Sequence, residues 1–172
     1  MEKTICCAIG HRPNGFPWNY RDINDARYME YKESMACYID LYIRKHRSNY
    51  FICGGAIGVD MDFAETVIDI RDNVYDDICL EIAAPCRYQD KKWAAKDKER
   101  YRKLLCNADI VTYVSEDYSM DCMMKRNKYM VDKSDIIFAF WNRNKTDGGT
   151  FGTIQYAKNQ GKPLEMFILN DY

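Results

Sequence analysis

Short apolar segments alternate strictly with longer amphipathic segments along the 172 residues of this chain. The short segments are almost continuously apolar, which is typical of strands that are buried on both faces of a sheet. Six strands are predicted, at residues 3–9, 50–53, 78–84, 109–114, 136–141 and 164–169. Five helices with apolar residues at helical spacing are predicted between them, at residues 24–47, 59–71, 92–106, 119–133 and 150–160.

This alternation constrains the fold because each strand–helix–strand unit joins two parallel strands through a right-handed crossover. The prediction is an α/β fold, a Rossmann-like three-layer α/β/α sandwich with a mainly parallel sheet. No linker, repeat or shift in composition divides the chain, so residues 1–172 are expected to form a single domain. Ligands of such sheets bind beyond the carboxyl ends of the strands, at the switch point in strand order.

The composition excludes several classes of protein. Hydrophobic residues make up 47% of the chain, charged residues 30%, and the formal net charge is −1. No apolar run approaches the ~20 residues of a membrane span, and the near-neutral charge disfavours nucleic acid as a partner. The N-terminus lacks the features of a secretory signal, and no two of the eight cysteines have C-x-x-C spacing. We therefore expect a cytoplasmic protein with free thiols, no metal site and no membrane partner.

The loop after the first predicted strand carries three candidate ligand contacts, Gly10, His11 and Arg12. Gly10 lets the main chain leave the sheet in a tight turn. Arg12 has the fork geometry that pairs with phosphate, and His11 can donate to a phosphate or exchange a proton. An ordinary polar turn explains the same residues equally well, so this loop alone leaves both interpretations open.

A glycine-rich loop follows the second predicted strand. Gly54, Gly55 and Gly58 precede a predicted helix, a pattern that offers main-chain N–H groups and the helix N-terminus to an anion. It is neither G-x-G-x-x-G nor a Walker A loop. Asp60, in the first turn of the helix, either caps the helix or reaches a ribose hydroxyl or a metal.

A second glycine-rich loop follows the fifth predicted strand, with Gly148, Gly149 and Thr150 before another predicted helix. Two phosphate-cradling loops at neighbouring strand ends can hold the two ends of one nucleotide. Arg126, on the helix before that strand, either points at this site or belongs to a solvated basic stripe.

Residues 87–103 contain eight basic and three acidic residues, with aromatic residues between them. An exposed helix face explains this run better than a nucleic-acid patch does. Tyr28, Tyr31, Tyr38 and Tyr42 repeat at helical spacing, which fits either the core or a dimer interface. A homodimer therefore remains open as a partner.

Seven short segments occur in a fixed order along the chain: Gly-His-Arg-Pro at 10–13, Gly-Gly-Ala-Ile-Gly-Val-Asp at 54–60, Gln and Trp at 89 and 93, Arg-Asn-Lys-Tyr-Met-Val at 126–131, Ser-Asp at 134–135, Gly-Gly-Thr at 148–150 and Gly-Lys-Pro at 161–163. Together they resemble one known family, the YpsA-like branch of the SLOG superfamily. The superfamily includes the Smf/DprA proteins and the LOG phosphoribohydrolases. The resemblance implies a Rossmann-like fold and a site for a nucleotide-derived ligand, to which it adds Asn127 beside Arg126.

The comparison with LOG enzymes also shows a departure. Their Pro-Gly-Gly-x-Gly-Thr-x-x-Glu motif ends on the catalytic glutamate, whereas this chain has Asp147 in place of the proline and Gln155 and Tyr156 in the region of the glutamate. Cleavage of an N-glycosidic bond passes through a cation-like transition state that a carboxylate stabilises, and glutamine lacks that charge. Hydrolysis of the LOG type is therefore only an alternative to binding. Single-stranded DNA binding of the DprA type is a second alternative.

The sequence thus predicts a sensor or regulatory module that binds a nucleotide-derived small ligand, of the ADP-ribose, NAD or nucleoside monophosphate type, at the carboxyl ends of the strands. No catalytic residue is assigned, and no cofactor is required. The predicted ligand-binding residues are Gly10, His11, Arg12, Gly54, Gly55, Gly58, Asp60, Arg126, Asn127, Gly148, Gly149 and Thr150.

Overall fold

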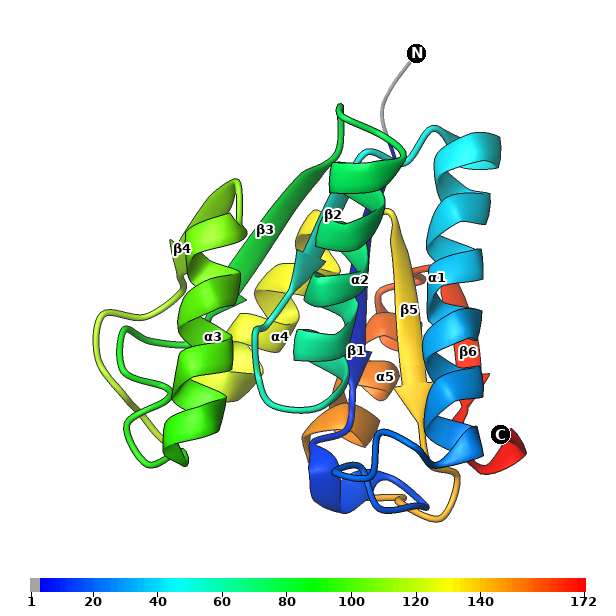
Figure 1. The fold of residues 1–172 in the computed structure, drawn as a ribbon. Coiled ribbons are helices and arrows are strands. Elements are labelled where there is room, and N and C mark those ends of the chain that lie inside the picture. The colour runs from blue at the N-terminus through cyan, green and yellow to red at the C-terminus, as the bar shows by residue number, and fades with distance from the viewer. Residues whose placement is uncertain (1–3) are drawn as a thin grey trace.

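Six parallel strands form one sheet in the computed structural model, which describes residues 4–172 (Figure 1). The strands are β1 (Ile5–Gly10), β2 (Tyr50–Cys53), β3 (Cys79–Ala84), β4 (Ile110–Tyr113), β5 (Ile136–Trp141) and β6 (Leu164–Ile168). The helices are α1 (Ala26–His46), α2 (Val59–Asn73), α3 (Ala95–Asn107), α4 (Cys122–Lys133) and α5 (Gly148–Asn159). The predicted Rossmann-like α/β fold is confirmed; residue 3, where the first strand was predicted to begin, lies outside the described residues.

Two helix boundaries differ from the sequence prediction. The α3 helix begins at Ala95 rather than at residue 92, because a turn in which the Trp93 N–H donates to the Asp90 carbonyl precedes it. The α5 helix begins at Gly148, two residues before the predicted start. Glycine is a poor helix former, so the pattern placed the helix start after both glycines. In the structure Gly148 and Gly149 belong to the first turn of α5, where main-chain N–H groups have no helical partner.

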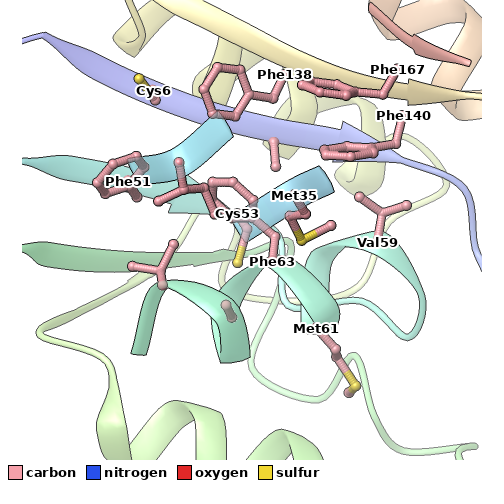
Figure 2. Packing of buried hydrophobic residues seen from close by; sticks show 14 of the residues in the cluster. Cys6, Met35, Phe51, Cys53, Val59, Met61, Phe63, Phe138, Phe140 and Phe167 are labelled. Carbon is pink, nitrogen blue, oxygen red and sulfur yellow. The ribbon is translucent and has the colours of Figure 1, made fainter. Parts of the chain in front are cut away.

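Helices cover both faces of the sheet. Alternate residues of β5 show the division: Phe138 and Phe140 pack among the residues of α1 and α2, while Ile137 and Ala139 pack with α4 and α5. On the first face, Figure 2 shows Phe138 and Phe140 beside Phe167 of β6, and the rings of Phe140 and Phe167 stack with centroids 4.4 Å apart. The inner strands β1, β2 and β5 are almost entirely apolar because both of their faces are buried, whereas β3 carries Glu81 and the edge strands β4 and β6 are partly exposed.

The tyrosines of α1 divide between core and surface. Tyr31 and Tyr42 are buried, and their rings meet Phe140 and Phe138 of β5 edge to face. Tyr38 is 38% exposed. The core therefore accounts for the apolar stripe of α1, and a homodimer stays a prediction.

None of the helices among residues 4–172 is both long enough and apolar enough to cross a bilayer. The eight cysteines are free thiols, and five of them are buried. Burial raises the pKa of the Cys6 and Cys7 thiols to about 12, so both act as small apolar side chains at neutral pH.

A buried carboxylate ties α4 to the sheet. Glu81, on β3, is fully buried and accepts hydrogen bonds at 2.7–2.8 Å from four side chains. The donors are Tyr50, Thr112, Tyr129 and Lys133. Since Tyr129 and Lys133 belong to α4, this network fixes the helix that also carries Arg126.

The strand order β4-β3-β2-β1-β5-β6 places the switch point between β1 and β5. The chain leaves β1 toward α1 on one face of the sheet and leaves β5 toward α5 on the other (Figure 1). The two loops therefore part at the carboxyl ends of these strands, which opens a crevice between them.

Candidate functional site

A cleft of about 440 Å³ lies at this switch point. Its wall comes from the loops after β1, β2 and β5 and from the facing sides of α4 and α5. The lining residues are Ile9, Gly10, His11, Arg12, Asn14, Gly15, Ala56, Ile57, Asp60, Met123, Arg126, Asn127, Met130, Lys145, Asp147, Gly148, Gly149, Thr150 and Thr153. Nine of the twelve predicted ligand-binding residues thus come together in one cavity; the other three are Gly54, Gly55 and Gly58.

Tight packing holds the loop after β1 against the start of α2. A Cβ atom on Gly10 would lie 2.5 Å from Val59 Cγ2, and the Val59 N–H donates to the His11 carbonyl at 3.1 Å. Gly10 therefore serves the close approach of α2, and the bond from Val59 fixes the main chain beside the cleft. The neighbouring Arg12 side chain is exposed and lies against Met123, with 3.8 Å between Nη2 and Sδ.

His11 is buried in the wall of the cleft, with 9% of its surface exposed. Its Nε2 atom has no hydrogen-bond partner among the described residues. Burial lowers the pKa of His11 to about 4, and the positive charge of Lys145 adds to the effect. The imidazole is therefore neutral at pH 7, and its Nε2 is a buried nitrogen without a partner in the described part of the chain.

The depressed pKa of His11 predicts a specific pH dependence of stability. Between about pH 6.5 and pH 4 the unfolded chain binds a proton at this residue and the folded chain does not, so stability falls as the pH is lowered through this window. The expected contribution is about 3 kcal/mol over the whole window. Denaturant unfolding at pH 7.5, 5.5 and 4.5 measures it, with His11→Gln as the non-titrating variant. Equal pH slopes for the wild type and His11→Gln would contradict the prediction.

The glycines of the loop after β2 serve internal packing. A Cβ atom on Gly54 would lie 1.7 Å from Arg126 Nη1, and one on Gly58, at φ +114°, would lie 2.3 Å from the His11 carbonyl oxygen. Gly55, at φ +67°, approaches Ile82 and Tyr101. These three glycines therefore shape the loop, and the cleft wall itself comes from their neighbours Ala56 and Ile57. Direct contact of the three with a ligand stays a prediction.

Arg126 is the buried cation at the floor of the cleft, with 5% of its surface exposed. Its Nη1 donates to the Gly54 carbonyl at 2.6 Å and lies 3.7 Å from Asp60 Oδ2. Its Nη2 donates no hydrogen bond to a residue in the range 4–172. Arg126 is therefore part of the cleft wall, as the first of its two interpretations predicted. Its burial excludes the second interpretation, a solvated basic stripe.

Asp60 both orders the loop and pairs with Arg126. Its Oδ2 accepts from the Ala56 N–H at 3.2 Å, inside the loop that precedes α2. Burial raises the pKa of this carboxyl, and the positive charge of Arg126 opposes that shift. The bond from Ala56 lies in the loop before α2, whereas the N-cap position of α2 is Gly58, which has no side-chain capping bond. A contact of Asp60 with a ribose hydroxyl or a metal stays a prediction.

A chain of hydrogen bonds connects Arg126 to the first turn of α5. Arg126 Nε donates to Asn127 Oδ1, Asn127 Nδ2 donates to Thr153 Oγ1, and Thr153 donates to the Gly149 carbonyl, each at 2.7–2.8 Å. Arg126 and the glycine turn are therefore held at a fixed spacing across the cleft.

The N-terminus of α5 faces open space. Asp147, the residue before the helix, makes no side-chain capping bond, and the first turn carries no acidic residue. Cβ atoms built on Gly148 and Gly149 would meet nothing within 4 Å. The N–H groups of this turn and the positive end of the helix dipole are thus accessible to an anion.

Lys145 and Met123 are among the lining residues that the sequence prediction missed. Lys145, in the loop before α5, adds a third cation to Arg12 and Arg126, against the two carboxylates of Asp60 and Asp147. A lysine just before a glycine-rich helix start was a usable signal; Met123 carried none, because only the fold brings it beside Arg12. Among residues 4–172, no cluster of three or more His, Cys, Asp or Glu side chains is arranged to hold a metal ion.

The comparisons with known proteins agree with this architecture. A family model described as the YspA SLOG family (YpsA) matches residues 6–170. The SPbeta prophage-derived protein YoqJ of Bacillus subtilis strain 168, itself uncharacterized, is 32% identical over 142 residues, which cover 76% of this chain and 81% of that protein. The UPF0398 protein YpsA of the same strain is 25% identical over 127 residues, or 71% of this chain and 70% of that protein.

The family match covers almost the whole chain and every segment that lines the cleft. The resemblance drawn from the glycine loops and the arginine helix is therefore confirmed, and the chain belongs to the YspA SLOG family.

Proposed function

We propose that this protein binds a nucleotide-derived small molecule in the cleft at the carboxyl ends of β1 and β5 and acts as a sensor or regulatory module. The ligand is of the ADP-ribose, NAD or nucleoside monophosphate type. The observation that carries the proposal is the uncapped N-terminus of α5, which opens into a cleft with three basic side chains.

The groups that line the cleft suit a phosphorylated ligand. The first turn of α5 offers main-chain N–H groups to a phosphate, and Arg126, Arg12 and Lys145 offset its charge. The unpaired Nε2 of His11 offers one more hydrogen bond. Gly148 and Gly149 leave the space that a phosphate requires against the main chain.

Binding is favoured over hydrolysis of the LOG type. Gln155, in the region of the LOG glutamate, is exposed on α5 and does not line the cleft, and Tyr156 donates to Asp132 at 2.8 Å. Of the cleft carboxylates, Asp60 is engaged by Ala56 and Arg126.

Small-molecule binding is also favoured over single-stranded DNA binding. Several basic residues of the 87–103 segment pair with acidic residues of the chain, which lowers the positive charge that this segment offers to nucleic acid. Arg100 binds the buried Asp62, and Arg102 and Lys103 pair with Glu99.

Thermal unfolding with ADP-ribose, NAD, AMP and a single-stranded oligonucleotide tests the proposal. A ligand that binds only the folded state, at a free concentration of 100 times its Kd, adds about 2.7 kcal/mol to the free energy of unfolding and raises the midpoint temperature. Analysis of the recovered nucleotide separates a sensor from an enzyme, since only an enzyme releases base or ribose phosphate. No shift with any nucleotide would contradict the proposal.

Replacing Gly149 with leucine is expected to weaken nucleotide binding by about 100-fold or more, because the side chain fills the phosphate position. The free energy of unfolding should change little, since nothing in the folded chain lies within 4 Å of the new Cβ atom. Gln155→Leu adds the same side chain to an exposed position of α5 and serves as the matched control. Unchanged affinity of Gly149→Leu in isothermal titration would remove the α5 turn from the site.

A further inference from the structure

A second cavity, of about 640 Å³, adjoins the cleft. It lies between the loop after β3 and the loop after β4, and it shares Arg12 and Met123 with the cleft. Since Arg12 Nη2 lies 3.8 Å from Met123 Sδ, these two side chains form the boundary between the two cavities. We name this second space the aromatic cavity, after Tyr88, Trp93 and Tyr118 in its lining.

Two of these aromatic rings have little to pack against in the protein. Tyr88 is 73% exposed and Tyr118 is 71% exposed, and they come from the two facing loops. Trp93 is fixed by an edge-to-face contact with Tyr101, with ring centroids 5.3 Å apart. Exposed aromatic rings that line one cavity from two different loops are suited to stacking on a planar ring of a ligand.

Gln89 supplies a directional contact in the same cavity. It is 8% exposed, and its Nε2 donates to the Gly54 carbonyl at 3.2 Å and to Tyr101 Oη at 2.7 Å. These two acceptors fix the orientation of the amide, so Oε1 remains as a buried acceptor, with no donor among the described residues. An unsatisfied buried acceptor is costly, and an N–H group of a ligand would satisfy it.

The aromatic cavity is lined by charges of both signs. Apart from Arg12 at the boundary, its charged lining residues are two lysines, Lys91 and Lys92, and two carboxylates, Glu116 and Asp117.

We propose that the aromatic cavity holds the heteroaromatic base of the ligand whose phosphate lies in the cleft. This inference rests on the proposed function and makes it more specific. The ligand is a nucleotide with a planar base that carries an N–H donor; Tyr88 and Tyr118 stack on the base, Gln89 Oε1 accepts from it, and Arg12 binds the phosphate at the boundary. The exposed aromatic rings and the unpaired Gln89 oxygen at one end of the phosphate cleft carry the inference.

The test compares ligands with and without a base. Isothermal titration is done with ADP-ribose and AMP, which carry adenine, and with ribose 5-phosphate, which does not. The Tyr88→Ala/Tyr118→Ala double variant is expected to bind the adenine ligand about 10- to 100-fold more weakly and ribose 5-phosphate equally well. Met120→Ala is the matched control, because Met120 is 97% exposed, lies on the same loop as Tyr118 and does not line the cavity.

Trp93 fluorescence provides a second readout of the base position. Because Trp18 and Trp141 also emit, the signal of Trp93 is taken as the difference between the wild type and Trp93→Phe. The adenine ligand should change this difference, and ribose 5-phosphate should not, because only a base reaches the aromatic cavity. An ADP-ribose analogue with unsubstituted purine lacks the 6-amino donor and is expected to bind about 10-fold more weakly through the loss of the Gln89 contact.

The outcomes separate this inference from the proposed function. The base position would be overturned if the Tyr88→Ala/Tyr118→Ala variant bound the adenine ligands with unchanged affinity. It would also be overturned if the wild type bound ribose 5-phosphate but neither adenine ligand. Either result would leave the phosphate cleft intact. Failure of the wild type to bind every one of these ligands would overturn both. Salt-sensitive oligonucleotide binding that is lost in the double variant, without nucleotide binding, would assign the cavity to single-stranded DNA and overturn the inference.

Discussion

Replacing Arg126 with methionine is expected to weaken nucleotide binding by about 10- to 100-fold, the value of one charge-assisted hydrogen bond to phosphate. The same change should lower the free energy of unfolding by about 3–5 kcal/mol, because it leaves a buried carboxylate without its cation. Asp60 lies 3.7 Å from Arg126 Nη1, and the carbonyl of Gly54 also loses its donor. Isothermal titration measures the affinity, and denaturant unfolding measures the stability.

A double variant separates these two effects. Asp60→Asn combined with Arg126→Met removes the unpaired buried charge and keeps a side-chain oxygen for the Ala56 N–H, so most of the lost stability should return. Nucleotide affinity should stay low, since the cation is still missing. Recovered binding in the double variant, or wild-type affinity in Arg126→Met, would show that Arg126 acts through the fold alone and does not bind phosphate.

Replacing Glu81 with alanine is expected to lower the free energy of unfolding by about 3–5 kcal/mol. The fully buried carboxylate accepts from Tyr50, Thr112, Tyr129 and Lys133, and its removal leaves these donors unpaired beside a cavity in the sheet. Glu165→Ala, which removes a partly exposed strand glutamate that accepts from Tyr42, should cost about 1 kcal/mol as the matched control. Equal losses for the two variants in urea unfolding would contradict the prediction.

The charge of Glu81 also has a defined pH signature. Burial raises its pKa, but the hydrogen bonds from Lys133 and the three hydroxyl groups outweigh burial and hold the pKa below its usual value of 4.5. A lowered pKa stabilises the folded state above about pH 4.5, and this contribution is lost as the pH falls through the folded value. The difference in stability between the wild type and Glu81→Gln should therefore shrink below pH 4.5. A constant difference down to pH 3 would show that the charge contributes nothing.

Much of the site could be predicted from local sequence because it lies in the loops after strands. Once six strands alternate with helices, the carboxyl ends of all strands share one edge of the sheet, so the polar loops at residues 10–12 and 148–150 had to lie there. The glycines of the loop after β2 show where this reasoning stops. Their pattern matches a phosphate loop, but Gly54 is required by the packing of Arg126, a residue 72 positions away in the chain.

The sequence alone determined the α/β class, the parallel sheet and the edge that carries the site, because hydrophobic period and crossover geometry are local properties of the chain. Only the tertiary structure decided which side chains meet in the cleft. It brought Lys145 beside His11, closed the pair between Asp60 and Arg126, and set the aromatic cavity next to Arg12. Such contacts join segments far apart in sequence, and their burial, which sets the charge of His11 and leaves the Gln89 oxygen unpaired, exists only in the folded chain.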